Sequence, residues 1–354
     1  MALLALIVPL LPAVAQDAAD TVAADTVPEP PRPIAPADYG KWESLGFGEL
    51  SPNGEWMAVP ISRVNDENEL RIHRVGADSV VVIPYGRQAA FSGDGRWAAY
   101  LIGLSEDERE AMERREERPE QSLGLLDLGS GDTTLIAGVS AFELSDDGRF
   151  LAMRRYPAGQ AQGDDAHGAD LVVRELATGT DVNFGNVGEF AWQEDGPLLA
   201  MTVDAADNAG NGVRVWDADD GAIRVLDSRP ADYSELRWRD DAPDLVVLRA
   251  REDDDREKPT HAVLAWKDVE GRTRAFAFEP ATREDFPADT RIVEYRAPAF
   301  SEDGEAVFFG LQEWEYTDEA LERMEAEADT TAAEGEDAGE GEPEGGADDE
   351  EEEP

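Results

Sequence analysis

Short apolar runs separated by polar turns recur along most of the chain. Each run is about four to six residues long, and the runs are rich in aromatic and β-branched residues, which is typical of short β-strands. One turn motif returns six times: an apolar or aromatic residue, a Ser or its replacement, a few polar residues that include Asp or Asn and usually Gly, and then a second apolar run. The six copies are Leu50–Val59, Phe91–Tyr100, Leu144–Met153, Trp192–Met201, Trp238–Val247 and Phe300–Phe309.

Each copy predicts a strand, a tight turn and a second strand. The Ser and Asp oxygens cap the turn, and its Gly adopts a positive φ. A second hairpin follows in most periods, with turns at Gly129–Asp132, Thr178–Gly179 and Asp219–Gly221. Four short strands in each period of about 40–50 residues are typical of a β-propeller blade. We therefore predict an all-β fold, a β-propeller of about six visible four-stranded blades. A β-sandwich is the alternative, but it would not repeat one turn motif six times.

The sixth copy differs from the others on its C-terminal side. Only one strand, Ala306–Leu311, comes before the chain becomes highly charged. A propeller normally closes by pairing strands from its two ends, which leaves no unpaired edge. Because no hairpin of the earlier type follows Leu311, we expect an open or incompletely closed ring with an exposed strand edge on the last blade.

The residues outside the repeats have three different compositions. Residues 1–15 are an apolar run that ends in Ala13-Val14-Ala15, and at less than the ~20 residues that cross a bilayer it predicts a signal peptide. The run lacks a basic residue, and a buried apolar helix is the alternative. Residues 16–37 read as a Pro/Ala/Asp-rich linker, 38–316 as the propeller, and 317–354 as a charged, mostly disordered acidic tail. We expect a periplasmic or secreted protein with no membrane span in the mature chain.

Composition excludes several classes of function. The 354-residue chain has no cysteine, which excludes disulfides, thiolate metal sites and a cysteine nucleophile. Its 80 Asp and Glu against 31 Lys and Arg give a formal charge of −49. Such a charge repels phosphate backbones and anionic lipid, so we expect no nucleic-acid partner.

Motifs for catalysis and cofactor binding are missing. No Gly-x-Ser-x-Gly elbow of an α/β-hydrolase occurs, and the nearest approach, Gly129-Ser130-Gly131, lies in a predicted hairpin turn. His73, His167 and His261 are isolated from one another, without metal-ligand spacing. The acidic clusters Asp253–Asp255 and Asp204–Asn211 lack the alternating ligands and closing Glu of a calcium loop. We predict no catalytic, cofactor-binding or metal-binding residue and no cofactor.

The segments that link the repeats resemble a known family. Asp38–Leu45, leading into Leu50–Gly54, is similar to the propeller start of secreted bacterial serine peptidases of the prolyl oligopeptidase (S9) family. Further matches are Gln121–Leu128, Gly168–Arg174, Asn183–Val187 and Gly210–Val213. The resemblance covers about residues 38–312. The repeat motif itself is less specific, because it also occurs in TolB-like and other propellers.

The resemblance implies a propeller that caps a C-terminal α/β-hydrolase domain and filters peptides on their way to the Ser, Asp and His of that domain. The hydrolase domain is not found in this sequence, so no catalytic residue is carried over and the chain is expected to be inactive alone.

Three hypotheses remain. The leading one is the substrate-gating propeller portion of a truncated S9-type peptidase, with the missing hydrolase domain and a peptide substrate as its partners. The alternative is a stand-alone periplasmic TolB/WD40-like propeller that binds a protein or peptide at its face. The third, a propeller lyase or glycosidase with a carboxylate site in the central channel, is the least favoured.

Overall fold

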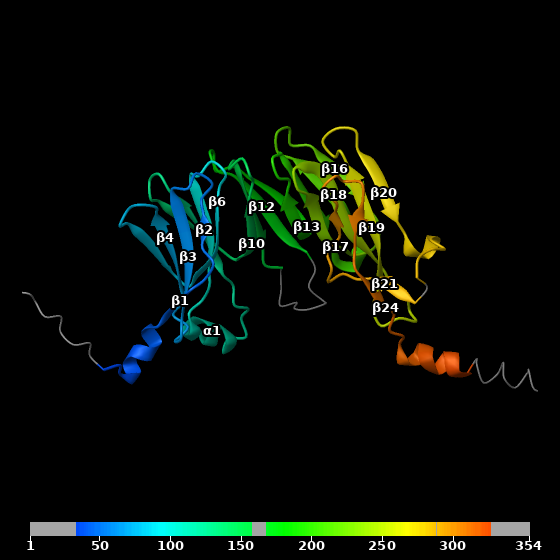
Figure 1. The fold of residues 1–354 in the computed structure, drawn as a ribbon, viewed down its shortest axis with the longest axis horizontal. Coiled ribbons are helices and arrows are strands. Elements are labelled where there is room, and N and C mark those ends of the chain that lie inside the picture. Colours follow the sequence, from blue (N-terminus) through cyan, green and yellow to red (C-terminus); the bar gives the residue numbers. More distant parts are fainter. Residues whose placement is uncertain (1–32, 158–167, 288, 327–354) are drawn as a thin grey trace, which may run out of the picture.

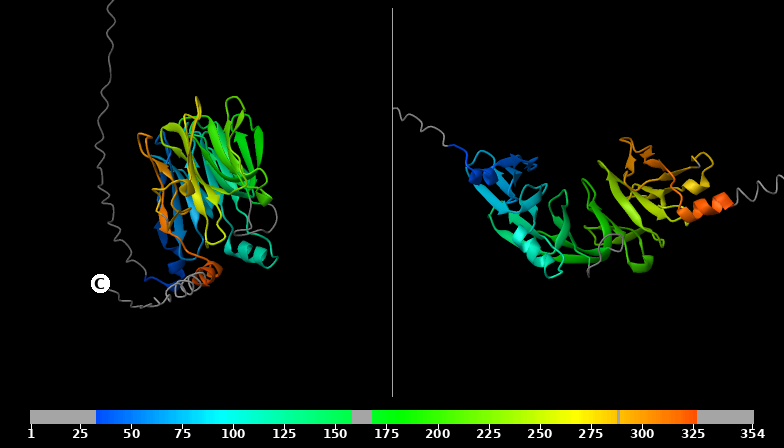
Figure 2. Two further views of the ribbon diagram at one scale, coloured as in Figure 1. Left: turned by 90° about the vertical axis from the view of Figure 1, so that its right-hand side faces the viewer. Right: turned by 90° about the horizontal axis from the view of Figure 1, so that it is seen from below.

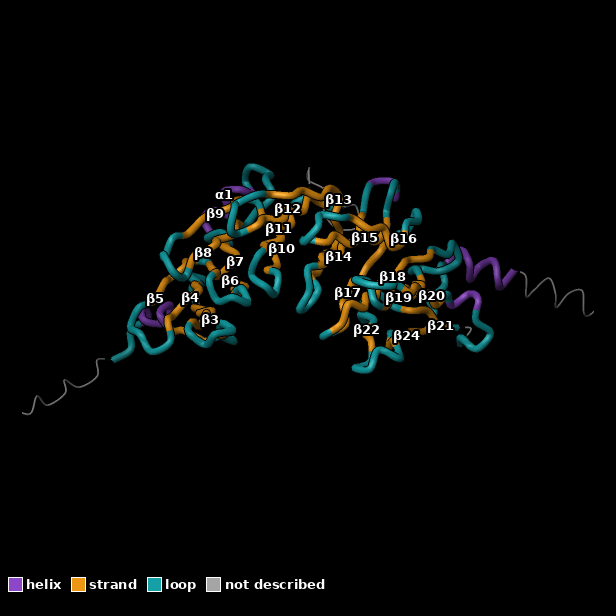
Figure 3. Tube along the Cα trace, turned by 90° about the horizontal axis from the view of Figure 1, so that it is seen from above, coloured by secondary structure: helices purple, strands orange, loops and turns teal. Residues whose placement is uncertain are grey.

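The computed structural model describes residues 33–157, 168–287 and 289–326, and most of the regular structure in this part of the chain is β-strand. The strands form antiparallel sheets that stand side by side along an arc (Figure 1). Seen from below (Figure 2, right) or from above (Figure 3), the arc is open on one side, and the first and last sheets lie at its two ends. The fold is a β-propeller, as the repeat predicts. Its two end blades are not paired with each other in the described residues.

The first three blades follow the chain from the inner to the outer strand. Blade 1 consists of β1 (Glu43–Leu45) and β2 (Glu49–Leu50), which both pair with β3 (Trp56–Arg63), followed by β4 (Glu69–Arg74) and β5 (Val80–Pro84). Blade 2 consists of β6 (Gly86–Phe91), β7 (Trp97–Ile102), β8 (Ser122–Asp127) and β9 (Thr133–Ala137). Blade 3 consists of β10 (Val139–Leu144), β11 (Phe150–Arg155), β12 (Ala169–Glu175) and the first part of β13 (Asp181–Trp192).

The last three blades repeat this order. Blade 4 consists of the second part of β13, β14 (Leu198–Val203), β15 (Gly212–Asp217) and β16 (Ile223–Asp227). Blade 5 consists of β17 (Tyr233–Arg239), β18 (Ala242–Arg251), β19 (Thr260–Lys267) and β20 (Arg274–Phe278). Blade 6 contains β21 (Thr290–Ile292), β22 (Ala299–Phe300), β23 (Val307–Phe308) and β24 (Leu311–Glu313).

Short helices lie between or beyond the blades. They are η1 (Pro36–Lys41), α1 (Glu106–Glu113), η3 (Ala206–Asn208), η4 (Pro280–Thr282) and a helix at residues 318–326. In Figure 1, η1, α1 and helix 318–326 all lie at the lower edge of the arc, and we call this side the α1 face. Strands β3 and β7 run toward the α1 face, so the repeat turns that precede them lie on the opposite face.

The repeat turns are closed by one hydrogen-bond network. In blade 2, Ser92 Oγ donates to Asp94 Oδ1 at 2.6 Å and accepts from the N–H of Trp97 at 2.9 Å, while the N–H of Arg96 donates to Asp94 Oδ1 at 3.0 Å. The same three bonds occur in the turns that begin at Ser51, Ser145 and Ser301. The predicted capping by Ser and Asp is therefore confirmed, and it satisfies backbone groups that a tight turn leaves without partners.

Apolar contacts between neighbouring blades form the core. Five buried clusters alternate with the six blades, one at each junction. In β14, Leu198 and Ala200 face blade 5, whereas Leu199 and Met201 face blade 3. Successive side chains of a strand point to opposite faces of its blade. When the blade has a neighbour on each side, a central strand therefore carries apolar residues at every position. This explains why the central strands are continuous apolar runs.

Strand β13 joins two blades without a turn. Its first part pairs with β12 and its second part with β14, so blades 3 and 4 form one seven-stranded sheet. A register shift between Val187 and Phe190 marks the transition from one blade to the next. No turn motif of the sequence marks this boundary, because one strand runs from blade 3 into blade 4.

Blade 6 is smaller than the four-stranded prediction. β21 pairs only with β24, and β22 only with β23, so the described residues supply an inner and a second strand but no outer pair. After the sixth turn, Phe308 on β23 is 64% exposed and Leu311 on β24 is 47% exposed. The expected open ring with an exposed edge on the last blade is thus observed for the described residues.

The segment after β24 is held against a loop of blade 5. The N–H of Glu257 donates to the carbonyl of Glu315 at 3.0 Å, and the N–H of Thr317 donates to the carbonyl of Asp255 at 3.1 Å. Between them, the guanidinium of Arg256 lies 4.7 Å from the ring centroid of Trp314 and 3.6 Å from that of Tyr316. The charged excursion at residues 251–258 therefore anchors helix 318–326 to the α1 face.

Glycines of the repeat turns provide a stability test. Gly95 and Gly148 have φ angles of +67° and +69°, and a Cβ on Gly95 would lie 2.3 Å from Asn53 Nδ2 in the turn of blade 1. We expect Gly95→Val and Gly148→Val each to lower the free energy of unfolding by roughly 1–3 kcal/mol, because a β-branched residue is strained at positive φ.

A substitution at Gly54 tests backbone strain without crowding between blades. Its φ is +70°, but a Cβ there would meet nothing within 4 Å. Gly54→Val should therefore cost less than Gly95→Val in urea unfolding. Unchanged midpoints for both Gly95→Val and Gly148→Val would refute the turn geometry.

Candidate functional site

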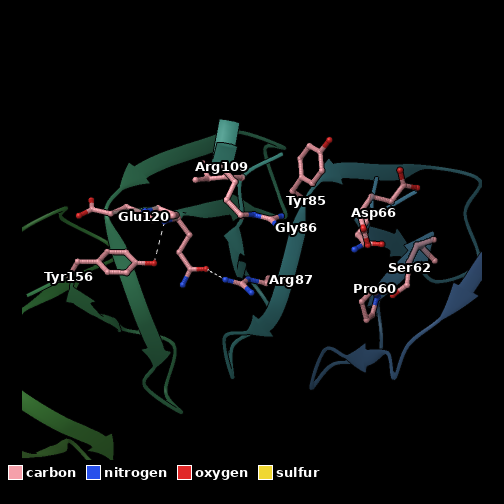
Figure 4. A pocket seen from close by; sticks show the side chains of 16 residues that line it. Pro60, Ser62, Asp66, Tyr85, Gly86, Arg87, Arg109, Glu120 and Tyr156 are labelled. Atoms are coloured by element: carbon pink, nitrogen blue, oxygen red, sulfur yellow. Dashed lines mark hydrogen bonds between the residues drawn. The ribbon is translucent and has the colours of Figure 1, made fainter. Parts of the chain in front are cut away.

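A cavity of about 510 Å³ opens on the α1 face where blades 1, 2 and 3 meet. This is within the range of pockets that bind small ligands. Figure 4 shows its walls: Pro60, Ser62 and Asp66 from blade 1 on one side, Tyr85 to Arg87 at the entry to blade 2, and Glu120 and Tyr156 on the other side. We call it the α1-face cavity.

Tyr85 connects blade 1 to blade 2 in an uncommon backbone conformation. Its φ is +56°, a value that is rare for bulky residues and costs of the order of 1–3 kcal/mol. Two backbone hydrogen bonds hold it: the N–H of Tyr85 donates to the carbonyl of Asn68 at 2.8 Å, and its carbonyl accepts from the N–H of Gly103 at 2.9 Å. Strain of this kind often accompanies functional sites.

A buried amide holds an arginine at the cavity wall. Arg87, on the inner strand of blade 2, donates from Nη2 to Oε1 of Gln121, which is only 8% exposed. The amide Nε2 of Gln121 donates to the carbonyl of Ser140 at 3.0 Å, and the Gln121 N–H donates to the hydroxyl of Tyr156 at 3.3 Å. Three blade segments therefore fix the position of the Arg87 guanidinium before any ligand binds.

A second arginine comes from helix α1. Ser105 caps this helix by accepting from the N–H of Glu108 at 3.3 Å, while Glu108 Oε2 accepts from the N–H of Ser105 at 2.9 Å. This capping box stabilises the start of the helix. In Figure 4, Arg109 extends from α1 toward Gly86 at the start of β6. The cavity is thus lined by two guanidinium groups on its blade 2 side.

Carboxylates of the cavity are held apart from these arginines. Glu69 pairs with Arg63 and Arg71 at 2.9 and 2.6 Å, and these hydrogen bonds, Arg63 first, lower the pKa of Glu69 despite the opposing effect of burial. Oε2 of Glu120 lies beside Gly138, which Nη2 of Arg155 also approaches. Asp66 and Ser62 offer acceptors on the blade 1 wall, and Arg87 and Arg109 offer guanidinium donors on the blade 2 side, which Glu120 also lines. This arrangement is suited to a dipolar ligand.

A smaller cleft, of about 240 Å³, lies on the repeat-turn side between blades 2, 3 and 4. Its central group is Glu143 on β10, whose Oε1 accepts from the N–H of Trp192 in the next blade at 3.2 Å. Burial raises the pKa of Glu143 to about 7, although the Trp192 N–H opposes this shift. We interpret Glu143 as a structural link between blades 3 and 4, because its carboxyl already has an internal partner.

The residues considered for chemistry in the sequence do not come together. His73 lies on β4, and His261 is buried on β19 with Nδ1 2.9 Å from the carbonyl of Ile292. Burial lowers the pKa of His261. His167 lies outside the described residues. In the described ranges, no group of three or more His, Asp or Glu could hold a metal ion, and the Asp253–Asp255 cluster contributes instead to the C-terminal anchor.

Sequence reasoning did not identify Tyr85, Arg87, Arg109 or Gln121. Gln121 begins one of the segments that carry the family resemblance, and this was the one available signal. Their proximity depends on blade-to-blade geometry, which no local motif records.

Comparisons with known proteins find similar structures at low identity. No protein-family model and no curated protein matches the sequence. Among solved structures, the chain is similar to the β-propeller domain of the Trilobed protease from Pyrococcus furiosus, described as having an open velcro topology, with 12% identity, a TM-score of 0.44, and coverage of 78% of this chain and 79% of that one.

Two further similarities have the same character. Prolyl oligopeptidase B from Galerina marginata matches with 13% identity and a TM-score of 0.45, over 78% of this chain and 42% of that one. TolB from Acinetobacter baumannii matches with 12% identity and a TM-score of 0.35, over 67% of this chain and 55% of that one. In the described part of this chain, no helix is long and apolar enough to cross a membrane.

Glu143 makes stability depend on pH. Its pKa rises from near 4.5 in the unfolded chain to about 7 in the fold, so its contribution is complete below pH ~4.5 and is lost as the pH rises through 7. Glu143→Gln keeps an acceptor for the Trp192 N–H and removes the titration. From pH 5 to pH 8, we expect the free energy of unfolding of the variant to rise by roughly 2–3 kcal/mol relative to that of the wild type.

Urea unfolding at both pH values measures this difference. The exposed Glu55→Gln variant is the control, because Glu55 lies on a surface turn with its side chain 58% exposed. If Glu143→Gln and Glu55→Gln give parallel pH profiles, the assignment of Glu143 as a buried carboxyl is wrong.

Proposed function

We propose that this chain is the substrate-gating propeller portion of an S9-type serine peptidase acting on peptides, with catalysis in a hydrolase domain outside these residues. The observation that carries the proposal is the position of the α1-face cavity. It opens on the face that also carries η1 and helix 318–326, the two ends of the described chain (Figure 1). A domain joined to either end would therefore lie on the same face of the arc as the opening.

The chemistry of the cavity supports peptides as ligands. A peptide carries N–H donors and C=O acceptors along its length, and the cavity offers acceptors on its blade 1 wall and guanidinium donors on its blade 2 wall. The family resemblance of residues 38–312 supports the same class of substrate. We also propose a periplasmic or secreted location from the apolar run at residues 1–15, which lie outside the described residues.

Blocking the cavity tests peptide gating. Gly103 lines the cavity, has no positive φ, and a Cβ there would contact only the Tyr85 carbonyl at 3.6 Å. Gly103→Phe should place its ring in the cavity and weaken the binding of short labelled peptides, measured by fluorescence anisotropy, by ~10-fold or more, since pocket ligands bury most of their surface.

Gly185→Phe is the matched control. Gly185 lies exposed on the outer strand of blade 3, where a Cβ would have one neighbour, Asp170 Oδ1 at 3.8 Å. This variant should bind peptides as the wild type does. Equal binding by both variants, or no peptide binding by the wild type, would contradict the proposed gate.

The chain by itself should not hydrolyse peptides or esters. Within the described residues, neither His73 nor His261 forms a hydrogen bond with a serine, so the pairing that activates a serine nucleophile in S9-type peptidases is not seen there. We expect proline-containing fluorogenic peptides and an activated ester to react at the uncatalysed rate. Turnover that is abolished by replacing one serine would show that this chain carries its own catalytic site.

A further inference from the structure

Two arginines of the α1-face cavity, Arg87 and Arg109, have no acidic partner within the part of the chain that the structure describes, although the sequence has 80 Asp and Glu against 31 Lys and Arg. Among the described residues, no carboxylate oxygen lies within the 4.0 Å limit of an ion pair from Arg87 or Arg109. Arg63 and Arg71 in the neighbouring blade are both paired with Glu43 and Glu69. Asp66, Glu69 and Glu120 also line the cavity, yet none of these carboxylates forms an ion pair with Arg87 or Arg109.

The partner of Arg87 is neutral. Gln121 accepts one N–H of the guanidinium and fixes its direction, but it supplies no negative charge. Gln121 is in turn held by the carbonyl of Ser140, so the pair is part of the wall and not a chance surface contact. A positioned guanidinium with free N–H groups is the geometry that binds a carboxylate in a planar, two-bond arrangement.

We propose that the α1-face cavity binds a short peptide through a peptide carboxylate, with Arg87 and Arg109 as the carboxylate-binding residues. The wall with Ser62 and Asp66 receives the N–H groups of the same peptide. The cavity volume of about 510 Å³ accommodates a ligand of this size. This inference rests on the proposed function, because it names the part of a peptide that the gate recognises.

The net charge of the chain makes the inference sharply testable. A charge of −49 disfavours any anionic ligand at long range, so without a local site an acidic peptide should bind more weakly than its amide. A preference for the acid can therefore come only from a local cationic site. Two groups of a peptide can supply this carboxylate: its C-terminus or an acidic side chain.

The experiment compares three N-acetylated tetrapeptides by isothermal titration with the full chain. The first has a free C-terminal carboxylate, the second is its C-terminal amide, and the third is an amide with one Glu side chain. We expect the peptide with the free carboxylate to bind ~10-fold more tightly than its C-terminal amide, because it alone forms charge-assisted hydrogen bonds with the arginines at this partly exposed site. Tight binding of the Glu-containing amide as well would identify the side chain as a second source of the carboxylate.

Variants assign the preference to the two arginines. Arg87→Gln and Arg109→Gln should each bring the ratio of acid to amide affinity close to one or below. Gln121→Glu leaves both arginines in place but supplies an internal carboxylate to Arg87, and it should have the same effect. Arg274→Gln, an equal loss of charge on the exposed outer strand of blade 5, should keep the wild-type ratio.

The outcomes separate this inference from the proposed function. If acid and amide bind equally and Gly103→Phe weakens both, the peptide gate stands and carboxylate recognition is wrong. If Arg274→Gln lowers the ratio as much as Arg87→Gln does, the preference arises from overall charge and the inference is also wrong. If the wild type binds none of the three peptides, both proposals fail.

Discussion

Burial of strands on both faces is the constraint on which this molecule depends. A blade with two apolar faces is stable only when a neighbour covers each face, so no internal blade could stand alone in water. β14 shows the extreme case, with all six of its residues buried and its side chains shared between two junctions. In four of the six repeat turns the Ser-centred hydrogen-bond network also sets the position of the next strand. The arc extends as each blade packs on the one before it.

The ends of the arc relax this constraint in different ways. In β4, Leu70 and Ile72 face blade 2, so Glu69 and Arg71 belong to the other face of blade 1. There Arg63 and Arg71 form ion pairs with Glu43 and Glu69, where an internal blade would present apolar side chains to a neighbour. Blade 6 instead leaves Phe308 largely exposed and has no outer strands among the described residues. The first blade is thus partly adapted to water, whereas the last blade retains an apolar, unpaired edge.

Much of the fold could be predicted because its information is local and repeated. Ser92, Asp94 and Gly95 specify one turn by themselves. Four of the six copies keep this Ser, Asp or Asn, and Gly pattern, and the other two keep the flanking apolar runs. The continuous strand β13 was not predictable, since a blade boundary inside a strand leaves no turn residue. The docking of Arg256 between Trp314 and Tyr316 was hidden for another reason: the partners are far apart in sequence and their contact depends on where blade 5 places its loop.

The candidate site was less predictable than the fold. No sequence spacing relates the three residues of the site. Arg87 lies on β6, Arg109 lies on α1, and Gln121 lies immediately before β8. Tyr85 is not a residue type from which a positive φ would be expected, and its backbone bonds to Asn68 and Gly103 depend on contacts that the local sequence does not show. The prediction that the chain carries no catalytic residue remains a prediction.

The connection between blades 1 and 2 has a mechanical consequence. Blades 3 and 4 share β13 and cannot rotate against each other without bending a paired strand, whereas blades 1 and 2 are joined through the single residue Tyr85 between β5 and β6. One wall of the cavity belongs to blade 1 and the other to blade 2. Any change in the angle between these blades therefore changes the distance between the walls, so a ligand that spans the cavity acts as a strut that sets the curvature of the arc at that end.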